Sequence, residues 1–358
     1  MLSYFQNVRE EIRRELKVFF DRKAEEFERV NALGQDLCAR LYEFSAQGKM
    51  IRGGLVSLAY SLFRGDGEQS AVREKLVAAG AAMELFQSGL LVHDDIMDRD
   101  PVRRGLASLY HQYVEMADGK GIAESAHLGE SLGICAGDVA FFLAFEILSG
   151  IDTDPVVHRD ILSLCSRELS YVGIAQMQDV YNGASTEPVT SPDIMKLYLY
   201  KTGRYTFSLP LAIGGLLAGR SRETVRKLEE IGEHLGVIFQ IRDDELGLFG
   251  DEQRMGKPVG SDVKEGKKTL YYGYLLNLAA PTVRRRLLDI FGREDLTEED
   301  LAYVRSLTEE LGVRKMIREH AGGLAEKARG LLESLHGVDE GRIALLRELL
   351  DYSMVRGS

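Results

Sequence analysis

The stretch LVHDDIMDRDPVRRG, residues 91–105, decides how the rest of this chain is interpreted. It places several carboxylates at the end of an apolar segment, where they are costly to desolvate without a cation or a positive partner. Asp94 and Asp98 are four residues apart, so in a helix they share one face and can reach one ion. Oxygen ligands that leave room for water and phosphate suit Mg²⁺ better than Zn²⁺. Arg103 and Arg104 add donors for phosphate oxygens.

A second acidic cluster, FQIRDDELG at residues 239–247, also follows apolar residues. Both clusters stand at the C-terminal ends of expected helices, where the helix dipole already disfavours carboxylates. A solvated acidic helix face would account for one such cluster taken alone. Two of them, each followed by basic residues, favour a metal-dependent site for a diphosphate.

The composition excludes several classes of protein. The chain has 358 residues, 45% of them hydrophobic, and a formal net charge of −11, which argues against a nucleic-acid binder. Its three cysteines are far apart and form no CxxC pair, so neither a zinc site nor a disulfide framework is expected, and a reducing cytoplasm fits best. The N-terminus lacks the order of a signal peptide, and the longest apolar stretches, near 139–145 and 208–219, fall short of a membrane span. We expect a soluble, cytoplasmic protein.

Helical periodicity dominates the chain, and only seven prolines interrupt it, none before Pro101. No linker rich in Pro, Gly and Ser divides the sequence. We therefore expect a single all-α domain over residues 1–358. Its helices are expected near 4–29, 31–46, 49–63, 70–98, 122–149, 155–182, 191–218, 222–248, 268–279, 297–333 and 339–352.

Three further segments could bind phosphate. Lys49 and Arg52 open a helix, and helix N-termini attract phosphate, although a solvated basic turn would be the favoured interpretation of this segment alone. Lys201-Thr202-Gly203 interrupts a helical region and could hold a diphosphate or be an exposed junction. The loop at residues 256–269 is dense in glycine and lysine and could contact phosphate or be merely solvated.

Other catalytic signatures are missing from the sequence. It contains no HExxH, no GxSxG and no GxxxxGK[ST] motif, so zinc-protease, serine-hydrolase and P-loop chemistry have no support. His93 beside Asp94 could be a base, but a single histidine at a helix position is more often structural.

Taken together, these residues resemble the trans-isoprenyl diphosphate synthases, the family of farnesyl and geranylgeranyl diphosphate synthases. Residues 94–105 are similar to its DDxxDxxxxRRG motif, 48–52 to GKxxR, 201–202 to its KT pair, and 239–244 to the start of its second aspartate-rich motif, with Gly256-Lys257 following. The matches keep the family order over most of the chain. The resemblance implies a bundle of long antiparallel helices around a deep central cavity, usually as a homodimer.

Two positions depart from the family pattern. Gly247 stands where a full second DDxxD would have its last acid, so the resemblance implies a metal ion held there by Asp243 with water or phosphate oxygens. Gln87 stands where many members carry a histidine that contacts isopentenyl diphosphate. Glutamine can donate a hydrogen bond to phosphate but adds no charge.

The resemblance also implies a mechanism, in which an allylic diphosphate (dimethylallyl, geranyl or farnesyl) ionises and isopentenyl diphosphate attacks the resulting cation. Mg²⁺, as three ions for which Mn²⁺ could substitute, would sit on Asp94, Asp98 and Asp243. Catalysis would involve these aspartates with Arg103, Lys201 and Lys257. Substrate binding would involve Lys49, Arg52, Gln87, Arg103, Arg104, Lys201, Thr202, Gln240, Lys257 and Lys267.

Product length is expected to depend on the helix that precedes the first cluster. Short-chain members commonly carry a bulky aromatic residue five positions before the first aspartate, and here that position is Gly89, which predicts an open cavity floor. Phe86 would lie about 4.5 Å deeper and stop growth there, or would simply pack in the core. We predict a twenty-carbon product, geranylgeranyl diphosphate, with twenty-five carbons or more as the fallback. A fifteen-carbon farnesyl product, a class I terpene cyclase and a non-catalytic subunit of a heteromeric synthase are the alternatives.

Overall fold

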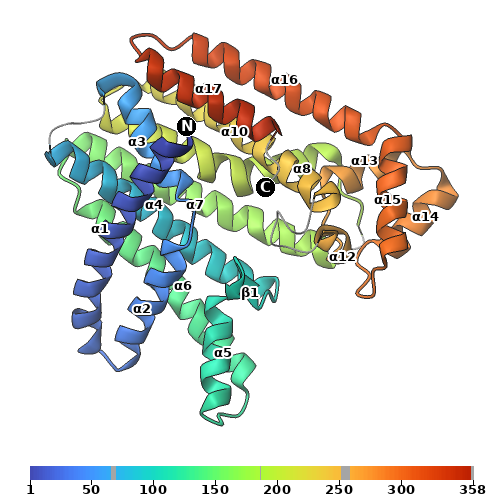
Figure 1. Cartoon of the computed structure of the whole chain (residues 1–358), viewed down its shortest axis with the longest axis horizontal. Helices are drawn as coiled ribbons and strands as arrows, with labels where there is room; N and C mark the ends of the chain where they lie inside the picture. Colours follow the sequence, from blue (N-terminus) through green and yellow to red (C-terminus); the bar gives the residue numbers. More distant parts are fainter. Residues whose placement is uncertain (66–69, 186, 251–258, 356–358) are drawn as a thin grey trace. The chain divides into compact units, whose positions relative to one another are not determined.

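The computed structural model describes residues 1–65, 70–185, 187–250 and 259–355. Over these residues the chain is almost entirely helical, as Figure 1 shows. Strand occurs there only in a small antiparallel hairpin, in which β1 (Val102–Arg103) pairs with β2 (Leu106–Ala107). The all-α prediction is confirmed.

The chain divides into two compact units. The first contains residues 1–163 and 210–220, and the second contains residues 164–209 and 221–358. The single domain expected over 1–358 stays a prediction.

The first unit is built around α4, which packs against α1, α3 and α6. Its helices are α1 (Leu2–Glu28), α2 (Leu33–Ala46), α3 (Ile51–Arg64), α4 (Ser70–Met97), α5 (Leu109–Gly119), α6 (Ser125–Ser149) and most of α9 (Leu209–Leu217). Two glycines let α3 and α4 approach closely, because a Cβ on Gly53 would lie 3.1 Å from the Gly80 Cα. This approach brings the start of α3 to the middle of α4.

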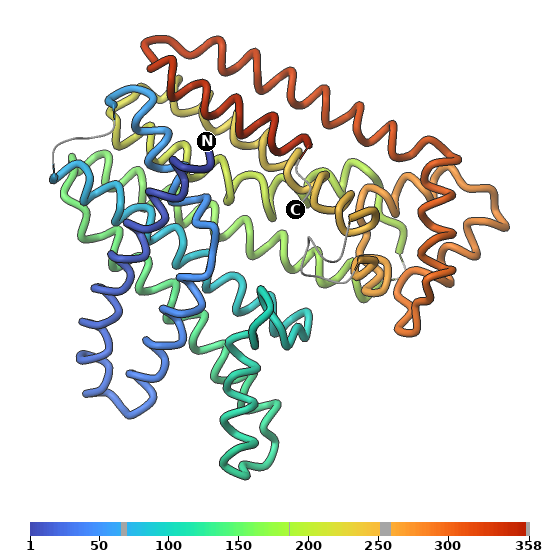
Figure 2. Tube along the Cα trace, in the orientation of Figure 1, coloured from blue at the N-terminus to red at the C-terminus, as the bar shows by residue number. Residues whose placement is uncertain are grey.

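The second unit is organised by α10, which packs against η1, α16 and α17. In Figure 2, α16 and α17 are the two long red segments at the C-terminal end of the chain. Ile194, Val237, Leu275, Val304 and Ile317 belong to its buried core. The elements of this unit are α7 (Pro155–Ala184, which begins in the first unit), α8 (Ser191–Leu197), η1 (Tyr198–Ser208), α10 (Arg222–Phe249), α12 (Ser261–Lys264), α13 (Leu270–Leu278), α14 (Pro281–Ile290), α15 (Glu298–Glu310), α16 (Val313–Glu333) and α17 (Glu340–Val355).

Two expected helices are divided. The helix predicted over 297–333 breaks between α15 and α16 at Gly312, whose φ of 69° is the left-handed conformation that glycine adopts without steric cost. The helix predicted over 191–218 contains an eleven-residue π-helical segment, η1, between α8 and α9. Such wide turns are rare and are often found at functional sites. The sequence analysis also missed α5, α14 and the hairpin.

Two helices are long and apolar enough to cross a membrane by length and composition alone. They are α4, with a mean hydropathy of 1.3 and 72% of the apolar window buried, and α6, with a mean hydropathy of 1.8 and 44% buried. We expected every apolar stretch to be too short to span a membrane. By length and composition alone, that expectation is wrong for these two helices. Burial accounts for α4 as a core helix of the first unit, whereas α6 also exposes Ile134 and Phe142. Such evidence for a span is weak, and the absence of one stays a prediction.

Candidate active site

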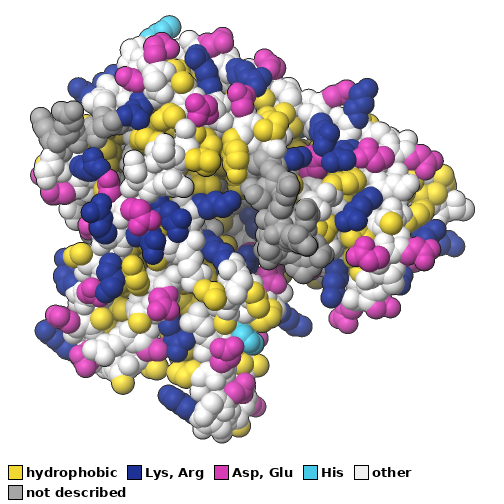
Figure 3. All heavy atoms as spheres, viewed as in Figure 1, with side chains coloured by type: hydrophobic (Ala, Val, Ile, Leu, Met, Phe, Trp, Pro, Cys, Tyr) yellow, Lys and Arg dark blue, Asp and Glu magenta, His cyan; other side chains and the backbone are white. Residues whose placement is uncertain are grey.

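Charge on the protein surface is mixed rather than segregated. Figure 3 shows basic and acidic side chains interspersed over the face in view. With a net charge of −11, a site for anions must therefore depend on local cations.

The first aspartate cluster lies at the C-terminal end of α4. The Asp98 N–H donates to the Asp94 carbonyl at 2.8 Å, so the helical turn continues through Asp98 and the two residues are one turn apart on one face. The Asp98 side chain is exposed, and the Asp94 side chain is 24% exposed. The structure thus brings together the two predicted metal ligands of this cluster where solvent can reach them.

Asp95, between them, has a different environment. Its side chain is fully buried, and Arg103 donates to Oδ1 through Nε at 2.6 Å and also through Nη2. Its other oxygen, Oδ2, has no hydrogen-bond partner among the described residues. Burial raises the pKa of Asp95 to about 6, although Arg103 opposes the shift. Arg103, predicted to bind the diphosphate, is held mainly by Asp95 and also lies 3.8 Å from Asp94.

The β1–β2 hairpin sets the positions of both arginines. Arg103 pairs with Leu106, leaving Arg104 and Gly105 as a two-residue turn. Their φ values of 55° and 79° are both positive, as a type I′ turn requires. The Arg-Arg-Gly sequence therefore has a local structural reason, because glycine tolerates the left-handed backbone that follows the two cations.

A second basic group forms at the start of α3. The buried Glu84 of α4 accepts a hydrogen bond from the Gly53 N–H at 2.9 Å. Burial raises the pKa of Glu84, whereas Arg52 and Arg104 oppose the rise. Arg104 also donates to the Phe44 carbonyl at 3.3 Å. Arg52 and Arg104, both predicted to bind isopentenyl diphosphate, therefore act on one buried carboxylate.

The other residues predicted at this end of the first unit are less constrained. Lys49 is exposed just before α3, and Gln87 is partly buried on α4. The sequence analysis missed Glu84. The signal was a lone acid within the apolar run from Met83 to Phe86.

The open cavity floor expected at Gly89 stays a prediction. A Cβ on Gly89 would lie 2.8 Å from Cε1 of Phe141 and 2.9 Å from the Gly137 carbonyl oxygen, so α6 fills that space. Phe86 is fully buried, with its ring centroid 4.9 Å from that of Phe145. Helical periodicity in the sequence predicted α4 but could not show that Phe141 of α6 packs against Gly89.

The second aspartate cluster lies near the end of α10. Asp243 is exposed, whereas Asp244 is buried and accepts hydrogen bonds from the Tyr198 hydroxyl and from Gln240 Nε2, the latter at 2.8 Å. Thr202 donates to Gln240 Oε1 at 2.9 Å, which links η1 to the same network. Burial raises the pKa of Asp244 well above its usual value, and the nearby Asp262 raises it further. Tyr198, which also accepts a hydrogen bond from the Leu270 N–H at 2.9 Å, was not predicted as part of this site.

Lys201 projects from η1 to α7, where its Nζ donates to Asp179 Oδ2. Both side chains are partly exposed. Asp179 was also missed, since nothing in the sequence joins positions 22 residues apart on different helices. The structure thus places Lys201, Thr202 and Gln240 in one unit with the second cluster, through η1 and α10.

The predicted phosphate loop is only partly described. Lys257 lies outside the described residues. Lys267 is partly exposed and forms an ion pair with Glu265 at 2.8 Å.

Comparison with known proteins establishes the family. The sequence model described as polyprenyl synthetase matches residues 37–308. The chain belongs to the polyprenyl synthetase family. It is 32% identical to a geranylgeranyl diphosphate synthase of Saccharolobus solfataricus, over 84% of this chain and 83% of that protein. It is 30% identical to a geranylfarnesyl diphosphate synthase of Aeropyrum pernix, over 89% of this chain and 93% of that one.

The fold is also similar to that of a solved structure. This is a geranylgeranyl pyrophosphate synthase from Corynebacterium glutamicum complexed with isoprenyl diphosphate and magnesium. The TM-score is 0.89 at 26% sequence identity, with 98% of each chain covered. The chain is therefore a transferase with the fold of this family.

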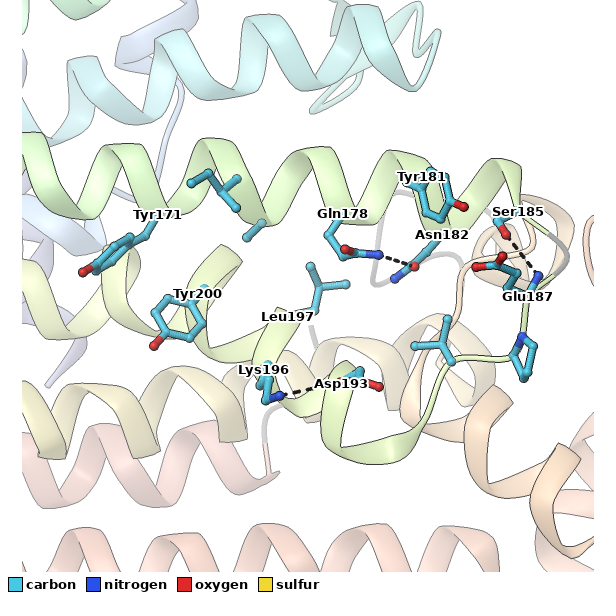
Figure 4. A pocket seen from close by; sticks show the side chains of 14 residues that line it. Tyr171, Gln178, Tyr181, Asn182, Ser185, Glu187, Asp193, Lys196, Leu197 and Tyr200 are labelled. Carbon is cyan, nitrogen blue, oxygen red and sulfur yellow. Dashed lines mark hydrogen bonds and ion pairs between the residues drawn. The ribbon is translucent and has the colours of Figure 1, made fainter.

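The polyprenyl synthetase chain also has a large cavity in its second unit, of about 690 Å³. Figure 4 shows that it lies between α7 and the segment around α8, with Gln178 directed toward Asn182 and Lys196 toward Asp193. None of the site residues predicted from the sequence lines it. We do not assign it to the active site.

The acidic residues of this polyprenyl synthetase fit Mg²⁺ that is shared with a substrate. Among the described residues, no group of three or more His, Cys, Asp or Glu side chains is arranged to hold a metal ion by itself. Mg²⁺ commonly takes one or two carboxylates and completes its shell with water and phosphate oxygens. The buried Oδ2 of Asp95, which accepts no hydrogen bond from the part of the chain that the structure describes, adds negative charge to the first cluster. An isolated pair such as Asp94 and Asp98 is what this coordination needs.

Proposed function

We propose that this transferase condenses isopentenyl diphosphate with an allylic diphosphate, in head-to-tail (1′-4) steps, up to geranylgeranyl diphosphate. The observation that carries this proposal is that the first unit contains two separate charged groups, each of which we assign to one diphosphate. One is the aspartate pair at the end of α4, and the other is the group of Arg52 and Arg104 at the start of α3. A condensation needs two diphosphate sites, whereas a terpene cyclase needs one.

In this proposal Asp94, Asp98 and Asp243 hold Mg²⁺, as three ions for which Mn²⁺ can substitute. When bound, the metal supplies positive charge that stabilises the departing diphosphate. The similar Corynebacterium structure, which is complexed with magnesium, supports this assignment. The acids that we assign to the metal are those that reach solvent, not the buried Asp95 and Asp244.

The remaining residues position the two substrates. Lys49, Arg52, Gln87 and Arg104 bind the diphosphate of isopentenyl diphosphate, in which Arg52 and Arg104 supply fixed charge. Arg103, Lys201, Lys257 and Lys267 bind the allylic diphosphate. Thr202 and Gln240, joined by a hydrogen bond at 2.9 Å, are fixed polar groups beside the reacting carbon. No activated nucleophile is required, because positioning and charge account for the catalysis.

The twenty-carbon product is supported by the relatives. Geranylgeranyl diphosphate synthases are present among both the sequence relatives and the similar structures. Because a geranylfarnesyl diphosphate synthase of Aeropyrum pernix is also a relative, a product of twenty-five carbons is the alternative. The allylic substrates would be dimethylallyl, geranyl and farnesyl diphosphate.

We also propose that the enzyme is a homodimer and acts in the cytoplasm. The exposed apolar side chains of α6, including Ile134 and Phe142, would be covered by a second copy. No nucleic-acid partner is proposed, in view of the net charge of −11.

One assay tests the proposed function. Purified protein is incubated with Mg²⁺, labelled isopentenyl diphosphate and each allylic starter in turn, and the product chain lengths are determined. We expect extension to twenty carbons. A hydrocarbon released from an allylic diphosphate alone would indicate a cyclase, and no turnover would indicate a non-catalytic subunit.

A further inference from the structure

Arg204 lies on η1, the segment that also carries two residues predicted to bind the allylic diphosphate. Lys201 donates to Asp179 of α7, and Thr202 donates to Gln240 of α10 at 2.9 Å. Both side chains therefore depend on where η1 lies between α7 and α10. Since η1 is one continuous π-helical segment, a shift of its backbone at Arg204 would move Lys201 and Thr202 as well.

Two carboxylates from different helices hold the Arg204 guanidinium. Its Nε and Nη2 donate to Oε2 and Oε1 of Glu168, both at 2.8 Å, and its Nη1 donates to Oε1 of Glu233. Glu168 lies on α7 and its side chain is only 2% exposed, whereas Glu233 lies on α10. Bidentate pairing of a guanidinium with a carboxylate fixes the orientation of both groups. Arg204 thus joins η1 to α7 and to α10 at once.

Two tyrosine rings lie beside the same guanidinium. Tyr171 of α7 and Tyr200 of η1 have ring centroids 5.5 Å apart, and Figure 4 shows them side by side at one end of the cavity. The Arg204 Cζ lies 5.9 Å from each centroid, within the range at which an aromatic ring attracts a cation. The hydrogen bonds to Glu168 raise the pKa of Arg204, so the group stays charged. Arg204 is therefore committed to contacts within the protein rather than to a diphosphate.

Glycines bring η1 directly onto α10. A Cβ on Gly236 would collide with the Gly203 backbone, and a Cβ on Gly232 would collide with the Ser208 backbone. π-Helical segments are rare, and most helices in proteins owe their stability to packing against their surroundings. The glycine contacts set how closely η1 approaches α10, but they offer no side chain that could fix its rotation. Arg204 supplies such a side chain.

We propose that Arg204 is a positioning residue for the allylic substrate, which fixes η1 between α7 and α10 and so holds Lys201 and Thr202 at the diphosphate. The inference rests on the proposed function, since that function assigns these two residues to the allylic diphosphate. A displacement of about 1 Å, caused by a change away from the reacting atoms, can lower the rate about a hundredfold. Lysine would restore the charge of Arg204 but not its planar fork.

A double-mutant cycle tests this proposal. The variants are Arg204→Lys, Lys201→Ala and the combination of both. Arg167→Lys is the matched control, because Arg167 also donates to Glu168, at 2.9 Å, but lies on α7. The readouts are kcat and the KM of each substrate for extension of farnesyl diphosphate by labelled isopentenyl diphosphate with Mg²⁺. The thermal midpoint of each variant checks folding.

We expect Arg204→Lys to lower kcat/KM for farnesyl diphosphate by about 10–100-fold, because the groups on η1 lose their fixed position. The KM for isopentenyl diphosphate should stay within about twofold of the wild-type value, since the residues assigned to that substrate lie in the first unit. In the Lys201→Ala background, Arg204→Lys should cost only about threefold or less, because the residue it positions is gone. The control should have the kinetics of the wild type.

Three results would overturn the inference. They are wild-type kinetics in folded Arg204→Lys, an equal rise in the KM of both substrates, and a full additional loss in the Lys201→Ala background. If Arg204→Lys does not fold, Glu233→Ala is judged by the same criteria, because it removes only the contact with α10 and keeps the pair with Glu168. The proposed function fails separately, if the wild type itself extends no allylic substrate.

Discussion

The two aspartate clusters both begin with an Asp-Asp pair but hold their buried acids differently. In each Asp-Asp pair the first acid reaches solvent and the second is buried. Asp95 is paired with the cation of Arg103, and burial raises its pKa to about 6. Asp244 is held by the neutral donors of Tyr198 and Gln240, and its pKa rises well above the usual range. The first acid of each pair is thus available to a ligand, and the second fixes the local structure by a different chemistry in each unit.

The largest effect is expected when a solvent-reaching acid of the first cluster is neutralised. Asp94→Asn should lower Mg²⁺-dependent turnover by about a thousandfold or more, because the loss of a metal ligand removes charge stabilisation in the transition state. Helicity and thermal midpoint should remain those of the wild type. Asp118→Asn, an exposed acid on α5, is the control. Near wild-type turnover in Asp94→Asn would mean that the first acid is not a ligand.

Replacing the two buried acids should instead lower the unfolding free energy of the protein by different amounts. Asp95→Asn leaves the largely buried Arg103 without its main charge partner and should cost about 3–5 kcal/mol of unfolding free energy. Asp244→Asn retains an oxygen that accepts from the Tyr198 hydroxyl, and should cost only about 1–2 kcal/mol. Urea unfolding of the two variants measures both values. Equal costs would remove the distinction between a charged and a neutral environment.

Replacing a cation at the start of α3 should change the KM for one substrate much more than the KM for the other. Arg52→Ala should raise the KM for isopentenyl diphosphate by about 10–100-fold, because a charge-assisted hydrogen bond is lost. The KM for the allylic substrate should change much less. An equal rise for both substrates would show that Arg52 does not belong to a separate second anion site.

Both Asp95 and Asp244 should contribute to the pH dependence of stability. An acid whose pKa is raised by folding stabilises the protein most below its unfolded pKa, and this contribution is lost as pH rises through the folded pKa. For Asp95 the loss should occur between 3.8 and about 6. For Asp244 it should begin above 3.8, since burial raises that pKa well above its usual value. Metal-free unfolding of the wild type, Asp95→Asn and Asp244→Asn over about pH 4–8 would show each contribution, and variants with the pH dependence of the wild type would contradict this account.

The smallest expected effect concerns product length. Because the Phe141 ring fills the space beside Gly89, Phe141→Ala should shift part of the product by one five-carbon unit. Gly89→Phe should mainly destabilise the contact between α4 and α6. Chain-length analysis of both variants tests this, and an unchanged distribution in folded Phe141→Ala would place the limit elsewhere.

The sequence predicted well those features that depend on one helix or one turn. The spacing of Asp94 and Asp98 on one helical turn, the start of a helix just after Lys49 and the all-α fold follow from periodicity and local charge. It failed where the outcome depends on packing between elements. The contact of Gly89 with α6, the pairing of Lys201 with Asp179 and the pairing of Arg204 with Glu168 each join residues that no local pattern connects.

The central claim is that this chain extends an allylic diphosphate at two separate anion sites with Mg²⁺. The most direct measurement is product analysis after incubation with labelled isopentenyl diphosphate and farnesyl diphosphate, with and without Mg²⁺. The account predicts labelled geranylgeranyl diphosphate only when the metal is present. Metal-independent extension, or no incorporation of the label with any allylic starter, would contradict it.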